Sequence, residues 1–287
     1  MQMMGLDKYK EKQASTLCLG TFDGFHRGHQ KLVETSEFLV TFDPHPKNVL
    51  SEKSTIERLS FPNELRYFFP NMLVIPFTKK TANMSPDEFL NAFIKPLKPT
   101  QITIGYDFKF GKQGQGDIKI LEAWGKKNKC KIIEIKIQKL TNDVAFKSSI
   151  IRKSLKTDPD FAFKLLGHPY LMEGTVIQGD NRGHAIGFPT ANIKIPRNKC
   201  VPKFGVYESQ TIVNGETHAS ITYIGKKPTF KNNEASIETH ILENFSANIY
   251  HEKIQVLFKR FIRDDIRFKN KDELIHQIKK DIQSILD

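Results

Sequence analysis

Two histidines and three glycines stand close together in the segment LGTFDGFHRGHQKL, residues 19–32, between an apolar run and an expected helix. His26 and His29 are three positions apart, so they would lie on one face of a helix that begins there. The first turn of a helix offers free N–H groups and the positive end of the helix dipole, which suit a phosphate group. Imidazoles beside such a turn could donate to phosphate oxygens and stabilise charge during phosphoryl transfer. The spacing therefore favours a phosphate site.

Two other interpretations of this segment remain open at the level of sequence. His26, His29 and His45 could bind zinc, although neither an H-E-x-x-H pattern nor a cysteine partner accompanies them. The segment could also be only a tight turn with incidental histidines, because glycines permit turns and close backbone approach. We favour phosphate binding over both.

A second candidate site lies in GTVIQGDNRGHAIGFPTANI, residues 174–193. Pro189 fixes the backbone locally, and Thr190 and Asn192, two positions apart, point the same way if the segment is extended. A pair of side-chain oxygens suits a magnesium ion that is shared with phosphates, because magnesium takes few protein ligands. The glycines of this segment could equally be turns of a barrel.

The first half of the chain alternates short apolar runs with helical patterns, which predicts a parallel sheet with covering helices. Ser85 and Glu88 form an expected capping box for a helix at 85–94, and a second helix is expected at 117–129. The expected strands are 15–20, 38–42, 72–77, 101–105 and 131–137. The first strand would end at the edge of the sheet where open α/β folds bind ligands, immediately before the two histidines.

The pattern changes after about residue 167. Short segments rich in Thr, Val, Ile and Tyr alternate with turn signals, which is typical of an antiparallel barrel or sandwich. A long amphipathic helix is expected at 270–286, and the segment 148–170 should be helical in two pieces that join the halves. We therefore predict an α/β protein with a Rossmann-like N-terminal domain, residues 1–166, and a C-terminal β-barrel domain, residues 167–287.

The composition fits a soluble globular protein: 39% of the residues are hydrophobic and 26% are charged. No apolar run approaches the roughly 18 residues that a membrane helix needs, and three widely spaced cysteines predict no disulfide framework. The net charge of +12 favours polyanions, but the lysines are spread along the chain. We expect small-molecule partners, no nucleic acid, no membrane partner and a cytoplasmic location.

Four segments of the first half resemble, in order, the motifs of the bacterial bifunctional riboflavin kinase/FMN adenylyltransferase (FAD synthetase) family. GTFDGFHRGHQ resembles its H-x-G-H motif, VTFDPHP its second motif, GYDFKFGKQGQGD its G-x-D-F-x-F-G segment, and SSIIRKSL its Ser/Thr-rich motif that ends in arginine. The second half resembles the riboflavin kinase signature around GFPTAN. That similarity continues through FGVYES, TYIGKKPTF, IETHIL and FIRDDIRF.

For residues 1–166 the resemblance implies an FMN adenylyltransferase, in which the FMN phosphate attacks the α-phosphorus of ATP and pyrophosphate leaves. His26 and His29 would be catalytic. The residues that would bind ATP are Gly20, Phe22, Asp23, Gly24, His26, Gly28, His29, Ser149 and Arg152. The flavin and adenine site would use His45, Asp107, Phe108 and Phe110, with core packing an equal alternative for Phe110.

For residues 167–287 the resemblance implies a riboflavin kinase that uses ATP and Mg²⁺. Glu238 would be the general base on the 5′-hydroxyl of riboflavin, and its alternative is a solvated strand carboxylate. Thr190 and Asn192 would hold the metal. The proposed ATP and flavin contacts are Gly174, Gly179, Arg182, Gly187, Pro189, Thr190, Asn192, Tyr207 and Arg263. Riboflavin, FMN and FAD would be its substrates and products.

Other functions and two spacings stay open. A single-activity riboflavin kinase, or a nucleotidyltransferase for another small phosphate, would keep this fold, and a basic nucleic-acid-binding protein is least favoured. The Ser/Thr-rich motif is shorter than in relatives, so Ser148 is an alternative match to Ser149. Only residues 30–39 separate His29 from Val40, fewer than a parallel crossover normally needs. We hypothesise that residues are absent from this stretch.

Overall fold

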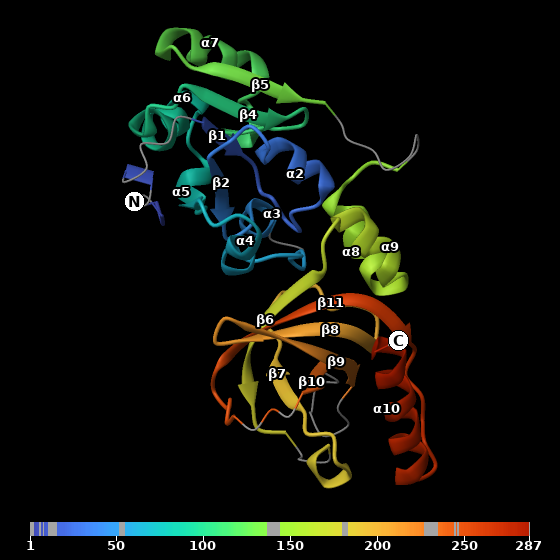
Figure 1. The fold of residues 1–287 in the computed structure, drawn as a ribbon. Coiled ribbons are helices and arrows are strands. Elements are labelled where there is room, and N and C mark those ends of the chain that lie inside the picture. Colours follow the sequence, from blue (N-terminus) through green and yellow to red (C-terminus); the bar gives the residue numbers. More distant parts are fainter. Residues whose placement is uncertain are drawn as a thin grey trace. The chain divides into compact units, whose positions relative to one another are not determined.

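The computed structural model describes residues 3–5, 7, 9–10, 16–51, 55–136, 144–179, 183–226, 235–243, 245 and 247–286. The chain forms two compact units, Met1–Ser148 and Ser149–Asp287. The first contains a sheet with helices on it, and the second contains a β-barrel (Figure 1).

A five-stranded sheet with the order β3-β2-β1-β4-β5 forms the centre of the first unit. Its strands are β1 (Thr16–Leu19), β2 (Phe38–Asp43), β3 (Met72–Pro76), β4 (Gln101–Gly105) and β5 (Lys131–Ile135). Every neighbouring pair is parallel, which confirms the predicted sheet. Because β1 is central, the turn that follows it emerges between the ends of β2 and β4.

Short helices connect these strands. They are α2 (Arg27–Val33), α3 (Pro46–Leu50), α4 (Pro62–Phe68), α5 (Lys79–Ala82), α6 (Pro86–Phe89) and α7 (Ile118–Asn128), with the π-turn η1 (Leu90–Ile94) and the 3₁₀ turns η2 (Lys95–Leu97) and η3 (Lys112–Gly114). The predicted capping box is confirmed. The Ser85 hydroxyl accepts the Glu88 N–H at 3.2 Å, and the Glu88 carboxylate accepts the Ser85 N–H at 2.7 Å.

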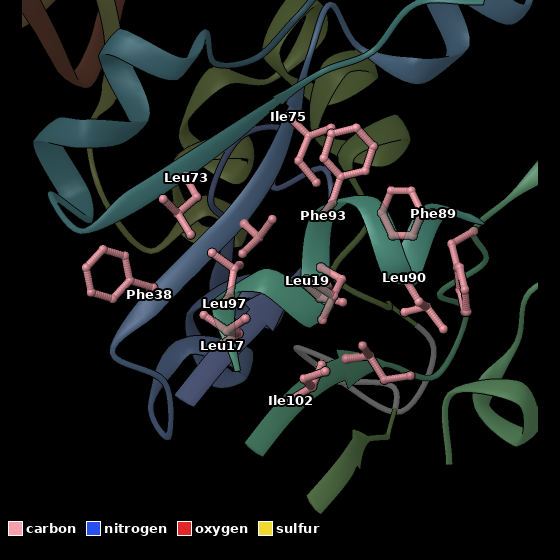
Figure 2. Close-up of a cluster of buried hydrophobic side chains, with 14 of the residues drawn as sticks. Leu17, Leu19, Phe38, Leu73, Ile75, Phe89, Leu90, Phe93, Leu97 and Ile102 are labelled. Carbon is pink, nitrogen blue, oxygen red and sulfur yellow. The ribbon is translucent and has the colours of Figure 1, made fainter. Parts of the chain in front are cut away.

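Side chains alternate along the strands, so the sheet has two apolar faces. On one face, Leu17 and Leu19 of β1 belong to a buried cluster with Phe89, Leu90 and Phe93 of α6 and η1 (Figure 2). On the other face a second cluster joins the strands to α2 and α4; it includes Cys18, Leu32, Leu39, Leu65, Met72 and Val74. The sheet is thereby covered on both sides, as buried parallel sheets require.

The connection from β1 to β2 is a short crossover. It runs through residues 20–37 and contains α2, and the two strands pair in parallel with Leu17 opposite Phe38. The turn before α2 belongs to this crossover together with the residues after His29. The absence of residues from this stretch stays a prediction.

A closed barrel with the strand order β10-β7-β6-β11-β8-β9 forms the centre of the second unit. Its strands are β6 (Tyr170–Ile177), β7 (Ala191–Lys194), β8 (Gly205–Val213), β9 (Glu216–Lys226), β10 (Ala235–Ile241) and β11 (Lys253–Arg263), and the 3₁₀ turn η4 (His184–Ile186) precedes β7. All neighbouring pairs are antiparallel. Of the two predicted alternatives, the barrel is confirmed.

Three predicted helices accompany the barrel: α8 (Ser148–Thr157), α9 (Pro159–Leu166) and the C-terminal α10 (Lys271–Leu286). The Asp160 carboxylate accepts the N–H of Phe261 in β11 at 2.9 Å, and the carbonyl of Leu155 accepts the N–H of Lys203 at 2.8 Å. These contacts attach α8 and α9 to the barrel. The compact unit therefore begins at Ser149, ahead of the boundary expected at 166/167.

Candidate functional site

The first candidate motif leaves β1 as a compact turn. The Gly20 N–H donates to the Val40 carbonyl and the Phe25 N–H to the Phe22 carbonyl, each at 3.1 Å. Phe22, Gly24 and Phe25 have φ values of 49°, 91° and 43°. Positive φ is unfavourable for a phenylalanine, and the burial of both rings in the apolar face around α2 and α4 offsets that cost. Packing therefore fixes the turn that precedes α2.

His26 is the N-cap of α2. Its Nδ1 accepts the N–H of His29 at 3.3 Å, and its carbonyl accepts the N–H groups of His29 and Gln30 at 2.7 and 2.9 Å. The rings of His26 and His29 stack with centroids 3.6 Å apart and planes 16° from parallel. Because Nδ1 of His26 accepts a hydrogen bond, the single N–H proton of its neutral ring is on Nε2. The two predicted histidines are thus brought together as a stacked pair.

His29 has a buried Nδ1 with no hydrogen-bond partner among the described residues. Burial, and secondly the charge of a protonated His26, lower the pKa of His29 well below its usual value. The edge of Phe22 packs against the same ring, with centroids 5.3 Å apart. The His29 imidazole is therefore neutral at physiological pH and holds a polar atom that no described protein group satisfies.

Asp23 anchors the motif through its side chain. The buried carboxylate accepts the N–H of Leu59 at 2.8 Å and that of Ser60 at 3.1 Å. Arg58, 2% exposed, has Nε 4.0 Å from the same oxygen and Nη1 2.7 Å from Asp43 at the end of β2. Sequence reasoning missed Arg58, because no motif contains it. Its role depends on two carboxylates that only the fold brings together.

Ser148 is the serine that contacts the first motif. Its hydroxyl donates to the Asp23 carbonyl at 2.8 Å. The predicted Ser149 is exposed and the predicted Arg152 is half-buried, and both lie on α8, in the second unit. Of the two serines, Ser148 therefore has the contact with the first motif, and which of them binds ATP stays a prediction.

The second motif ends β2. A cis peptide bond joins Asp43 to Pro44, and the buried His45 caps α3 by accepting the Lys47 N–H on Nδ1 at 3.1 Å. His45 and His26 therefore both use Nδ1 for backbone capping. Within the described ranges, no three His, Cys, Asp or Glu side chains group in a way that could hold a metal ion.

The third motif follows β4. Asp107 is exposed and Phe108 is half-buried beside the core. Phe110 is 5% exposed and packs against Phe89 and Phe108, with ring centroids 5.7 Å apart in both pairs. Phe110 therefore packs in the hydrophobic core, which was the alternative to a ligand contact in the sequence analysis.

In the second unit, Glu238 stands in a row of side chains that crosses three strands. In β10 it lies opposite Asn192 of β7 and opposite Tyr223 of β9. Ile237 and Thr239, its neighbours in β10, are buried in the barrel, so alternation directs Glu238 outward. A carboxylate, an amide and a phenol therefore stand side by side on this side of the strands, where Asn192 is buried at 7% exposure.

Two glycines make room for side chains of β7. A Cβ at Gly179 would lie 2.1 Å from Nδ2 of Asn192, and one at Gly174 would lie 2.3 Å from Ile193. Gly187 has a φ of 85° after the η4 turn. Sequence reasoning missed His240, whose Nδ1 lies 2.7 Å from the carbonyl of the exposed Pro189 and must donate to it. His240 thereby holds the segment that contains Thr190.

Other predicted contacts of the second unit have structural partners. Tyr207 is fully buried, and its hydroxyl donates to the Lys203 carbonyl at 2.5 Å. Arg263 contacts both oxygens of the buried Asp281 of α10: its Nε lies 3.1 Å from Oδ1, and its Nη2 lies 2.8 Å from Oδ2. Arg182 lies outside the described residues. The sequence pattern marked Tyr207 and Arg263 as ligand contacts. It did not indicate that both side chains also have partners within the protein.

Tyr223 is a further residue that sequence reasoning missed. Burial and the neighbouring Asp265 carboxylate, to which the phenol donates, raise the pKa of Tyr223 to about 12, and Glu238 contributes in the same direction. The phenol therefore stays protonated beside Glu238 throughout the physiological range.

Among the helices of the described residues, none combines the length and apolar character that spanning a membrane requires.

Comparison with known proteins gives matches to both units. The FAD synthetase family matches residues 8–149, and the riboflavin kinase family matches residues 166–287. The chain is 36% identical to the bifunctional riboflavin kinase/FMN adenylyltransferase of Bacillus subtilis, over 96% of this chain and 93% of that protein. It is 34% identical to the protein of the same name from Listeria monocytogenes, over 93% and 90%.

A solved structure shares the fold over nearly the whole chain. It is described as a macrolide-efflux protein from Streptococcus pneumoniae, and it superposes with a TM-score of 0.80 at 27% identity, over 95% of this chain and 94% of that one. That description concerns the Streptococcus pneumoniae protein alone.

Lowering the pH should destabilise the first unit through His29. In the folded state the pKa of His29 is depressed, so below about 6.5 the unfolded chain binds a proton that the folded chain does not. Stability is therefore lost as the pH falls from about 6.5 toward the folded pKa. Thermal unfolding at several pH values should show a flatter pH dependence for His29→Gln. The exposed His251→Gln is the control, and an unchanged slope in His29→Gln would contradict a buried neutral imidazole.

Arg58→Met should destabilise the first unit by about 2 kcal/mol, because it leaves Asp23 and Asp43 without their cation. The half-exposed Asp43 side chain limits the loss, since water can solvate it. Urea unfolding followed by the single tryptophan, Trp124 of α7, measures the change. Arg66→Met on α4 removes one positive charge from a half-buried site and serves as the control. Equal stability of the two variants would refute the role of Arg58.

Proposed function

Because this chain belongs to the bifunctional riboflavin kinase/FMN adenylyltransferase family, we propose that it phosphorylates riboflavin to FMN and then adenylylates FMN to FAD. One observation carries this proposal: the FAD synthetase and riboflavin kinase families match separate stretches, 8–149 and 166–287. We assign the adenylyltransferase to residues 1–166 and the kinase to residues 167–287. ATP, riboflavin and FMN are the small-molecule partners, and a cytoplasmic location without nucleic-acid partners suits this activity.

In the kinase reaction we assign the general base to Glu238. The 5′-oxygen of riboflavin forms a bond to the γ-phosphorus of ATP, the bond from that phosphorus to the β,γ-bridging oxygen breaks, and ADP leaves. The hydroxyl proton goes to the Glu238 carboxylate. The outward direction of Glu238 and its position opposite Asn192 support this role. Tyr223 stands beside it as a neutral phenol that donates its proton to Asp265.

Thr190 and Asn192 are the residues that would hold Mg²⁺. A hydroxyl and an amide oxygen are hard donors of the kind that this ion takes together with phosphate oxygens and water. The chain has space for them, because Asn192 occupies the volume that a side chain at Gly179 would fill, and Thr190 lies beside Gly183. When bound, the ion would neutralise charge on the ATP phosphates. His240 would keep the segment in place through Pro189.

In the adenylyltransferase reaction an FMN phosphate oxygen forms a bond to the α-phosphorus of ATP, the α,β-bridging bond breaks, and pyrophosphate leaves. This chemistry asks the protein to position two anions and to stabilise charge. We assign donors to the stacked pair of His26 and His29, whose unsatisfied buried nitrogen supports a ligand contact. Gly28 keeps the backbone open there, since its Cβ would lie 3.2 Å from the His26 ring.

The remaining assignments in the first unit follow from burial. Asp23 acts by holding the turn rather than by touching ATP, because its carboxylate is buried and bonded to Leu59 and Ser60. Asp107 and Phe108 are the residues we retain for the flavin or adenine, since both leave surface exposed.

Purified protein with riboflavin, ATP and magnesium should produce FMN and then FAD by chromatography. Glu238→Gln should abolish FMN formation while FMN supplied from outside is still adenylylated, because the amide cannot accept the proton. Equal loss of both activities would contradict separate sites. Wild-type protein that forms neither FMN nor FAD would refute the function itself, and activity on one flavin only would reduce it to a single-activity enzyme.

Gly179→Ala should lower riboflavin kinase activity strongly, because the new methyl group would overlap the Asn192 amide. The Michaelis constant for magnesium-ATP should rise, and FMN adenylylation should stay as in the wild type. Gly215→Ala, in the β8–β9 turn at a φ of 88°, is a control for the backbone cost of losing a glycine, since no atom lies within 4 Å of its Cβ position. A kinase that tolerates Gly179→Ala as well as Gly215→Ala would contradict the assignment.

A further inference from the structure

Five buried hydroxyl groups form a closed hydrogen-bonded ring inside the barrel. They come from β8 (Ser209, Thr211), β9 (Ser220, Thr222) and β10 (Thr239), and each residue is at most 2% exposed. We call this set the hydroxyl ring. Its oxygens are linked as Ser209–Thr222 at 2.7 Å, Thr222–Thr239 at 2.8 Å, Thr239–Thr211 at 3.1 Å, Thr211–Ser220 at 2.9 Å and Ser220–Ser209 at 2.8 Å.

Two of the five links have an assigned donor: Thr211 donates to Ser220, and Thr222 donates to Thr239. Each hydroxyl has a single proton, so a closed circuit is completed when Ser220 donates to Ser209, Ser209 to Thr222 and Thr239 to Thr211. Every member then donates once and accepts once within the ring, while the Ser220 carbonyl, 3.1 Å away, is a second acceptor for Ser209. Hydrogen bonds in such a chain strengthen one another, and a member that is lost leaves two buried neighbours unmatched.

Thr239 is the member of the ring that belongs to β10, and it follows Glu238 directly. The other inward side chains of β10, Ile237 and Ile241, pack without directional preference. The hydrogen bonds of Thr239 are directional and reach both β8 and β9. Together with the backbone pairing of β10 to β9 from Ala235 to Ile241, they fix where β10 stands along its own axis.

The position of β10 along its axis decides where Glu238 stands. β10 pairs with β7 at three positions only, and Glu238 with Asn192 is the middle one. A shift of one residue would turn Glu238 into the barrel interior, and a smaller shift would move it away from Asn192. We propose that Thr239, through the hydroxyl ring, is a positioning residue for the phosphoryl transfer to riboflavin. This proposal rests on the role proposed above for Glu238.

Thr239→Val and Thr211→Val form a matched pair of variants. Each keeps the side-chain shape, removes one hydroxyl and breaks two links of the ring, but Thr239 adjoins Glu238 whereas Thr211 lies on β8. The melting temperature of the second unit should fall similarly in both. The kcat of riboflavin phosphorylation should fall about tenfold to a hundredfold in Thr239→Val and clearly less in Thr211→Val, where Thr239 keeps its bond to Thr222, with the KM for riboflavin little changed. Thr239→Ser, which restores the hydroxyl, should recover most of the kcat.

Two results would overturn the proposal: equal losses of kcat in both valine variants, or an unchanged kcat in Thr239→Val. If Thr239→Val does not fold, Thr239→Cys and Thr211→Cys replace the pair, because a thiol is a weak donor of similar size. FMN adenylylation by the same preparations reports on the first unit. Failure of the proposed function would be seen separately, as kinase activity that survives in Glu238→Gln.

Discussion

The buried carboxylate of Asp23 is the constraint on which the candidate site of the first unit depends. It holds the main chain at Leu59 and Ser60, and the carbonyl of the same residue accepts the hydroxyl of Ser148. Three segments that are distant in the sequence thus meet at one residue of the turn after β1. A carboxylate deprived of such partners in the interior would be costly, so the turn cannot relax independently of them. His26 takes its orientation as the cap of α2 from this turn.

The two units orient their polar groups by different physical means. In the first unit, the groups lie on irregular backbone beyond the ends of the strands. Because no strand or helix fixes this backbone, buried phenylalanines and the ion pairs of Arg58 hold it in place. In the second, Glu238 stands on a regular strand, and the pleat of β10 directs it outward. Loops need anchors outside themselves, whereas a strand needs only the correct register.

The periodicity of the sequence was sufficient for the layers of the fold but not for the partners of individual side chains. Strands and helices follow from local patterns, so the sheet, the barrel and the capping box at Ser85 were predictable. Arg58 and His240 were not, because their roles depend on Asp23 and Pro189, which only tertiary structure brings near. For the same reason a motif pattern could not distinguish the core position of Phe110 from a ligand contact.

The hydroxyl ring also bears on how the barrel can change during evolution. Removing one hydroxyl leaves two polar groups unsatisfied in the interior, whereas replacing all five with apolar side chains of suitable volume would leave none. A barrel that keeps only some of the five hydroxyls is therefore less stable than one that keeps all of them or none of them. The five positions should be inherited as a block, with strong epistasis among residues of three different strands, and Thr239 should resist single replacements even though it is buried inside the barrel.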